Sequence, residues 1–477
     1  MACVPPKSFE ERLLGAGKGN VPDQTELGLL YLEGAGGARR DPALAADWLR
    51  KAAEAGDPKA RYNLSYMLSA GLGLPRDPAE SLRLLRLAAE AGFPPAEQNM
   101  ATLHVLGELV PRDVPRALEW YRRAADHGDL IAMYQMGVLH LQGENGVPED
   151  PELAAECFRR AAGGRLVDAQ YNLAIMCLRG HGTPRDPEEA ARLFYEAASR
   201  GNPQAQYSLA TMYESGEGVS GPDPVKAFFW YMESARAGVI PAQRSAGYML
   251  LTGGGTEADH PEAARWLAAA AGAGDGDAAF LLGLMHEAGD GVERDPEAAF
   301  RLFAAAAAKG DPEAAFRAAS LCLAPPAAGG GLTAEVPMVN GDAGSQGSSG
   351  NQGDQGSAGS QGDQRDLGGQ GSTPGGIPAP SEAVPFLKTA AANGHKGAMT
   401  ALASVLWEGV LTPSDRAGAM RLWESAAELG DADARFAYAG RILESPPDRP
   451  SVDRALEYLK ELAAEGYPGA REMLGEY

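Results

Sequence analysis

The sequence has few cysteines, no apolar run long enough to span a membrane, and no signal-peptide pattern at its start. Its 477 residues include four cysteines, and none of them forms a CxxC pair, so a zinc site or redox pair of that type is not expected. No stretch reaches the roughly 18 uncharged apolar residues of a membrane span, and the first residues lack the apolar core of a signal peptide. We therefore expect a cytoplasmic protein that does not bind to a membrane.

Basic residues are also in deficit. The chain has 42 Lys and Arg against 64 Asp and Glu, which gives a formal net charge of -22. An acidic surface repels phosphate groups, so nucleic acid is not an expected ligand. The same charge favours basic partner proteins and keeps an alanine-rich chain soluble.

Catalytic and cofactor motifs are missing too. The chain has no HExxH motif, no Walker sequence, and no nucleophile elbow outside one Gly-rich segment. We expect no enzyme activity, no cofactor and no metal site.

What the chain does have is a repeat, seen most clearly in residues 169–203. The first half has apolar residues at helical spacing and ends at Gly180. The second half opens at Asp186, which can cap a helix, followed by Pro187 at a position that needs no amide donor. Glu189 is placed to complete a capping box. The pattern predicts two helices per repeat.

The period can be counted from the residue that closes each second helix. These residues are Gly56, Gly92, Gly128, Arg165, Gly201, Gly238, Gly274, Gly310, Gly394, Gly430 and Gly466. Their spacing is 36 or 37 residues, except for a step of 84 between Gly310 and Gly394. Subtracting one period leaves an insertion of about 48 residues.

One position of the first helix is always small. It is filled by Gly28, Ser65, Ala101, Gly137, Ala174, Ala210, Gly247 and Gly283. A small residue there predicts that two helices cross closely. We assign the bulky partners to one position of the second helix, and to the core: Trp48, Trp120, Trp230, Trp266 and Trp423. Cys157, Cys177 and Cys322 are expected to be small buried residues.

Together these features resemble the Sel1-like repeat family, a relative of the tetratricopeptide proteins. The shared pattern runs Ala, Tyr, Leu, Gly or Ala, Met-Tyr, Gly-x-Gly, Asp-Pro, Ala, Trp-Tyr and Ala-Ala-x-x-Gly, and the period of 36 or 37 residues differs from the tetratricopeptide period of 34. The resemblance covers residues 22–324 and 382–477. It implies an all-α, right-handed α-solenoid of about eleven helix-turn-helix repeats, which binds proteins or peptides and has no catalytic activity of its own.

The repeats suggest a division of the chain into four parts. These are an N-terminal tail (1–20), a repeat array (21–324), a disordered Gly/Ser/Gln-rich insert (325–380) and C-terminal repeats (381–477). The insert has too few apolar residues to offset the entropy of ordering. It falls between the two helices of one repeat, residues 312–323 and 383–392. Either that repeat closes around the insert, or the last repeats form a separate arm.

Three of the seven histidines share one position near the end of the first helix. His104, His140 and His286 stand where Tyr31 and Tyr213 stand in other repeats. They are one or more repeats apart, which is too far for a shared metal ion. We expect partly buried imidazoles with hydrogen-bond partners.

One polar series is the candidate site. It directly follows the tyrosine position of the first helix and consists of Asn63, Asn99, Gln135, Asn172, Ser208 and Ser245. In related helical repeats the first helices line the concave surface, so the resemblance implies that this series faces a bound chain. An amide can donate to and accept from a peptide backbone without reading its sequence. The alternatives are a solvated face, or Asn side chains that bond the neighbouring repeat.

These observations favour a non-catalytic scaffold or adaptor that binds partner proteins or peptides on the concave face of the solenoid, with the insert as a tether. The alternatives are an enzyme with a site between repeats, and an exported repeat protein that acts on envelope or host partners.

Overall fold

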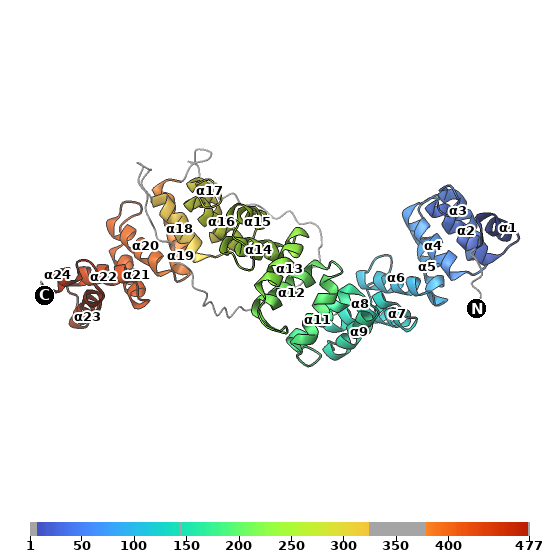
Figure 1. Cartoon of the computed structure of the whole chain (residues 1–477), viewed down its shortest axis with the longest axis horizontal. Helices are drawn as coiled ribbons and strands as arrows, with labels where there is room; N and C mark the ends of the chain where they lie inside the picture. Colours follow the sequence, from blue (N-terminus) through green and yellow to red (C-terminus); the bar gives the residue numbers. More distant parts are fainter. Residues whose placement is uncertain (1–6, 144–145, 324–377, 476–477) are drawn as a thin grey trace. The chain divides into compact units, whose positions relative to one another are not determined.

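The computed structural model describes residues 7–143, 146–323 and 378–475, and every regular element in these ranges is a helix. The helices follow one another in pairs (Figure 1), so the predicted all-α solenoid class is confirmed. The chain divides into two compact units, Met1–Ala258 and Asp259–Tyr477.

In the first unit, each even-numbered helix from α2 to α12 is the first helix of a repeat and packs against the odd-numbered helix that follows it. The helices of this unit are α1 (Phe9–Gly17), α2 (Val21–Glu33), α3 (Pro42–Glu54), α4 (Pro58–Ala70), α5 (Pro78–Glu90), α6 (Pro94–Leu106), α7 (Val114–Asp126), α8 (Leu130–Gln142), α9 (Pro151–Gly163), α10 (Val167–Arg179), α11 (Pro187–Ala198), α12 (Pro203–Ser215), α13 (Pro224–Arg236) and α14 (Ile240–Thr252).

The second unit continues the same alternation. Its elements are α15 (His260–Gly272), α16 (Gly276–Ala288), α17 (Pro296–Ala307), α18 (Pro312–Leu323), the 3-10 helix η1 (Pro380–Glu382), α19 (Ala383–Ala392), α20 (Lys396–Glu408), α21 (Arg416–Glu428), α22 (Ala432–Glu444), α23 (Arg449–Glu465) and α24 (Ala470–Gly475).

The helix ends follow the predicted chemistry, with one exception. The Asp186 side chain accepts a hydrogen bond of 3.0 Å from the backbone amide of Glu189, and Gly180 closes α10 in the left-handed conformation. The predicted capping box is wrong. The amide of Asp186 instead donates to the carbonyl of Cys177 at 2.8 Å, and the Glu189 carboxylate binds Arg192.

The small first-helix residues do mark close helix crossings. A Cβ added to Gly137 would lie 2.7 Å from the Phe158 ring, and one added to Gly283 would lie 2.7 Å from Phe303. The bulky partner position is filled by Leu49, Leu85, Tyr121, Phe158, Phe194, Tyr231, Leu267, Phe303, Leu387, Trp423 and Leu459, none more than 8% exposed.

The assignment of all five tryptophans to this position is therefore wrong. Trp423 is in the core position, but the others stand one residue earlier and are half-buried: Trp48, Trp120, Trp230 and Trp266. One residue is about 100° of helix rotation, which turns these indoles from the paired helix toward the surface. Cations cover two of them, with Lys51 4.1 Å from the Trp48 ring centre and Arg123 4.6 Å from that of Trp120.

The predicted burial of Cys157, Cys177 and Cys322 is confirmed, and burial raises the pKa of the Cys322 thiol to about 11. The histidine prediction is confirmed in part. His104 Nδ1 lies 3.4 Å from the carbonyl oxygen of Pro111, but the Nδ1 atom of the buried His140 has no partner among the described residues.

The insert separates two helices that pack together. Residues 325–377 of the predicted insert lie outside the described residues. Cys322 at the end of α18 shares a core with Val384 and Leu387 of α19, and the Glu313 carboxylate lies 2.8 Å from Nε2 of His395, within hydrogen-bond distance. This packing favours the repeat that closes around the insert over the separate arm.

The segment predicted as an N-terminal tail contains α1. Ser8 and Glu11 form a capping box at its start, and Phe9 meets the ring of Tyr31 on α2 edge to face. The first repeat is thus covered by a helix that lacks the repeat pattern.

Candidate functional site

The predicted polar series lies on six successive first helices of the first unit. Asn99 is exposed and the other five are half-buried: Asn63, Gln135, Asn172, Ser208 and Ser245. Each of these side chains is therefore in reach of solvent.

Three members of the series bond the first-helix tyrosine of the preceding repeat. Asn99 Nδ2 donates to the Tyr62 hydroxyl at 3.3 Å, and Asn172 Nδ2 donates to the Tyr134 hydroxyl at 3.2 Å. In the third pair, the hydroxyls of Ser208 and Tyr171 are hydrogen-bonded to each other. Burial raises the pKa of Tyr134 and of Tyr171, so both hydroxyls stay protonated at neutral pH. These hydrogen bonds match the alternative in which the polar side chains bond the neighbouring repeat.

The remaining members are placed differently. Asn63 Nδ2 donates to the carbonyl of Lys59 in its own helix at 2.8 Å, and Ser245 bonds the hydroxyl of Tyr231 on α13. Gln135 makes no side-chain hydrogen bond within the described ranges. Nor does any described donor reach Oδ1 of Asn99 or Asn172. Peptide binding by the series remains a prediction.

A second set of side chains stands three residues further along each of these helices, and so on the same helix face. It consists of Tyr66, Thr102, Val138, Ile175, Thr211 and Tyr248. None is buried, and Tyr66 and Tyr248 are 55% and 46% exposed. We call the two sets together the first-helix stripe.

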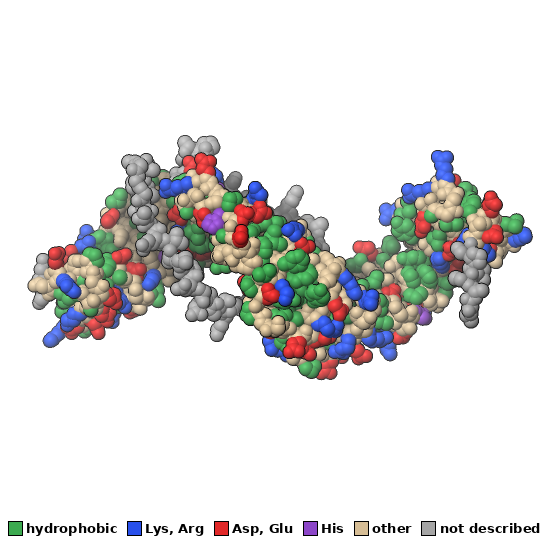
Figure 2. All heavy atoms as spheres, in the orientation of Figure 1, with side chains coloured by type: hydrophobic (Ala, Val, Ile, Leu, Met, Phe, Trp, Pro, Cys, Tyr) green, Lys and Arg blue, Asp and Glu red, His purple; other side chains and the backbone are tan. Residues whose placement is uncertain are grey.

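Another apolar surface belongs to the second helices α11 and α13. Tyr195, Val225 and Phe229 are more than half exposed, and Trp230 meets both Tyr195 and Phe229 edge to face. Figure 2 shows hydrophobic side chains gathered over α12 and α13, with charged side chains around them.

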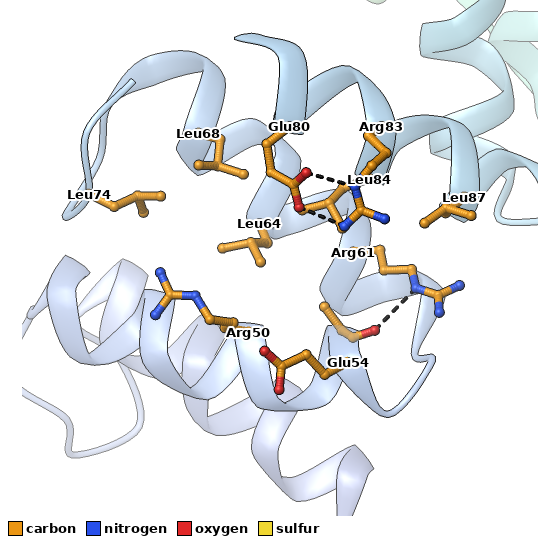
Figure 3. A pocket seen from close by; sticks show the side chains of 11 residues that line it. Arg50, Glu54, Arg61, Leu64, Leu68, Leu74, Glu80, Arg83, Leu84 and Leu87 are labelled. Carbon is orange, nitrogen blue, oxygen red and sulfur yellow. Dashed lines mark hydrogen bonds and ion pairs between the residues drawn. The ribbon is translucent and has the colours of Figure 1, made fainter. Parts of the chain in front are cut away.

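A cavity of about 370 Å³ opens between α3, α4 and α5 (Figure 3). Its apolar lining is Leu64, Leu68, Leu74, Leu84 and Leu87, together with Ala53. Charged side chains at the cavity are Arg50, Glu54, Arg61, Glu80 and Arg83.

Two of its three arginines have defined partners within the cavity wall. Arg83 binds the Glu80 carboxylate through two bonds of 2.7 Å, which lower the pKa of that carboxyl. Arg61 Nε donates to the carbonyl of Ala53 at 3.2 Å. No sequence pattern predicted this cavity. Its signal is Leu84, which stands where later repeats have Trp120 and Trp230.

The second unit has a smaller cavity of about 300 Å³ beside Trp407 and Trp423. Arg416 and Arg441 lie 5.1 and 5.0 Å from the Trp407 ring centre, and Arg441 also pairs with Glu444 at 2.8 Å. The buried Nε1 of Trp423 has no partner in the described part of the chain.

The described residues contain neither a metal-ligand cluster nor a helix that could span a membrane. No three His, Cys, Asp or Glu side chains in these ranges converge as metal ligands would. No helix among them has the length and apolar character to cross a bilayer.

The sequence model of the Sel1 repeat matches nine segments: 22–57, 58–93, 94–129, 130–163, 167–202, 203–239, 240–275, 276–311 and 397–431. No curated protein matches the chain. A protective antigen of uropathogenic Escherichia coli, described as displaying an SLR fold, is similar at 25% identity over 98% of this chain and 90% of its own, with a TM-score of 0.78. A Sel1 repeat protein from Oxalobacter formigenes is 30% identical over 64% of this chain and 88% of its own, with a TM-score of 0.50. Because the repeat matches cover well over half of the sequence, the chain belongs to the Sel1 repeat family.

Proposed function

We propose that this protein is a non-catalytic scaffold that binds partner proteins or peptides along its first-helix stripe. Sel1 repeat proteins generally mediate protein–protein interactions, and the family is generally non-catalytic. In this proposal the stripe lines the concave face of the array, as the first helices do in related helical repeats.

The observation that carries the proposal is the composition of the stripe. Six successive repeats present an amide or hydroxyl and, one helical turn away, a side chain that is not buried. The amides of Asn99 and Asn172 keep Oδ1 available for an incoming backbone N–H. The exposed rings of Tyr66 and Tyr248 add apolar contact area of the kind enriched at interfaces.

The inter-repeat bonds support binding rather than compete with it. Because Tyr62 holds Asn99, and Tyr134 holds Asn172, these amides lose little freedom when a partner arrives. Hydrogen bonds to such oriented amides would be gained at a low entropic cost.

The charge of the chain suggests the partner. With a net charge of -22, the protein attracts basic proteins at long range, and the attraction weakens with salt. We propose a cytoplasmic location, and a role as tether or spacer for the insert at residues 325–380.

One observation favours a second candidate function. The similar E. coli protein is described as a protective antigen, so a role outside the cell, on envelope or host partners, is the alternative. Cell fractionation with detection of the native chain separates the two locations.

The proposed function is tested by hydrogen–deuterium exchange on the full chain, with and without a partner captured by affinity purification. We expect partner-dependent protection to concentrate on α4, α6, α8, α10, α12 and α14. Protection confined to second helices would overturn the proposed surface.

A further inference from the structure

We propose that the cavity between α3, α4 and α5 binds an acidic peptide segment, taking one of its large apolar side chains onto the leucine floor and a neighbouring carboxylate at the arginine rim. The inference rests on the proposed protein-binding function, but it uses a surface separate from the first-helix stripe.

The floor of the cavity suits an apolar side chain. Leu64, Leu68 and Leu84 are 4%, 8% and 5% exposed, so they are held by the core beneath them and present a fixed surface. The volume of about 370 Å³ is at the lower end of the range typical of ligand pockets. An apolar anchor in such a pocket is the usual centre of binding energy in a protein interface.

The next repeat has a bulkier residue at the position of Leu84. In the next repeat Trp120, on α7, packs against the cluster that contains Leu85, Ala88 and Met100, and so fills the space beside α5. Leu84 holds the position of Trp120 on α5, and its shorter side chain lines the cavity. An incoming side chain would occupy the volume that an indole occupies one repeat later.

The charge around the cavity departs from that of the chain. Residues 42–90, from the start of α3 to the end of α5, contain seven Lys and Arg against six Asp and Glu, a net charge of +1 in a chain of -22. This local balance favours a carboxylate over an ammonium group at the rim.

The rim arginines can accept a carboxylate. The terminal nitrogens of Arg61 have no partner among the described residues, since only its Nε is bonded. Arg50 pairs with Asp47 at 3.2 Å, but both side chains are at least half exposed, and such pairs are weak. Glu54 forms no ion pair in the described ranges, so it is the rim group that would repel an acidic ligand.

The experiment uses the full chain as bait for a random 12-residue peptide library displayed on phage, with counter-selection on a Leu84→Trp variant. We expect peptides with a Leu, Met or Phe close to Asp or Glu, and loss of at least tenfold in affinity with Leu84→Trp in fluorescence polarisation. Tryptophan is native to this position in other repeats, so the variant should fold, and circular dichroism checks that it does. Enrichment of basic peptides, or of peptides that bind Leu84→Trp equally, would overturn the inference.

Exposed charge variants test the rim without threatening the fold. Glu54→Gln should tighten binding of a selected acidic peptide about two-fold, and Arg50→Gln should weaken it by a similar factor. Tightening by Glu54→Gln is an effect that a loss of structure cannot imitate. If the affinity stays unchanged in both variants, the carboxylate does not bind at this rim. If decanoate displaces the labelled peptide more strongly than unlabelled peptide does, the cavity binds a small amphiphile instead.

The two proposals fail separately. If no selected peptide depends on Leu84, while exchange protection by a captured partner still maps to the first-helix stripe, the cavity inference is wrong and the proposed function stands. If a Leu84-dependent peptide is found but no partner protects the stripe, the cavity inference stands alone.

Discussion

Gly182 lies against the backbone of Pro151, the residue that opens the second helix of the preceding repeat. A Cβ built on Gly182 would be 2.0 Å from the Pro151 carbonyl oxygen. The same approach recurs between Gly73 and Pro42, and between Gly218 and Pro187. The second glycine of the Gly-x-Gly pattern is therefore a contact between repeats as well as a turn residue.

Gly182→Ala should destabilise the protein by at least about 2 kcal/mol, because the methyl group overlaps a backbone atom that cannot move away alone. The matched control is Gly201→Ala. Gly201 also has a positive φ, of 84°, but its Cβ would meet nothing within 4 Å, so only the backbone strain of about 1 kcal/mol is expected. Chemical denaturation of both variants measures the difference, and equal losses would show that the contact is unimportant.

Leu49→Ala should destabilise more than Trp48→Ala, although leucine is the smaller residue. Leu49 is fully buried against Gly28, where a Leu→Ala change costs about 2–5 kcal/mol. Trp48 is half-buried beneath Lys51, and we expect its loss to cost about 1 kcal/mol. The urea midpoints of the two variants measure the two losses of stability. A larger loss for Trp48→Ala would contradict the placement of Trp48 outside the core position.

His140 should make the stability depend on pH. Burial lowers the pKa of His140 below its ordinary value of 6.5, with Asp150 opposing the shift. The unfolded chain therefore binds a proton at a higher pH than the folded chain, so the free energy of unfolding should fall as the pH drops through about 6.5. His140→Tyr, which copies Tyr31 and Tyr213, should show a smaller loss of melting temperature between pH 7.5 and 5.5 than the wild type.

The control for this comparison is His286→Tyr, since His286 holds the same position in a later repeat but is not fully buried and has a carbonyl partner 3.3 Å from its Nδ1. An equal change in both variants would show that burial of His140 is not the cause.

Replacing residues 325–377 by a loop of about five residues should leave the melting temperature unchanged or slightly higher. α18 and α19 already share a core, and a tenfold shorter loop reduces the closure entropy by about 2 kcal/mol at most. Differential scanning calorimetry would contradict this expectation if the shortened chain melted lower or in an additional step.

The sequence was sufficient to predict what depends on local chemistry. The position of Asp186 and Gly180 at helix ends follows from hydrogen bonding and left-handed geometry within a few residues, and both were confirmed. The period then determined the pairing of helices. The capping box failed because Arg192, one turn further on, binds the Glu189 carboxylate, and an amide competes poorly with a guanidinium.

Side-chain placement between repeats was harder to predict. Trp120 was assigned to the core on size, whereas the buried residue is its neighbour Tyr121, and one residue of helix phase separates the two. The cavity lined by Leu84 could not be predicted from the repeat pattern, because that pattern marks residues that recur and Leu84 is a smaller residue at a position where other repeats have tryptophan. The partners of Asn99 and Asn172 lie about one period away in the sequence, so these hydrogen bonds depend on how neighbouring repeats pack and could not be derived from local sequence.

Partner affinity of the Asn63→Ala, Asn99→Ala, Asn172→Ala triple variant tests the central claim most directly. Its control is the Tyr62→Phe, Tyr134→Phe variant, which removes the inter-repeat bonds of Asn99 and Asn172 but keeps the amides. If the stripe binds the backbone of a partner, the triple variant should lose about ten-fold to nearly a thousand-fold in affinity by isothermal titration calorimetry, or roughly 1.5–4 kcal/mol, and the tyrosine variant much less. If both variants melt lower and both bind the partner as tightly as the wild type, the polar series only joins one repeat to the next, and the proposed binding surface is wrong.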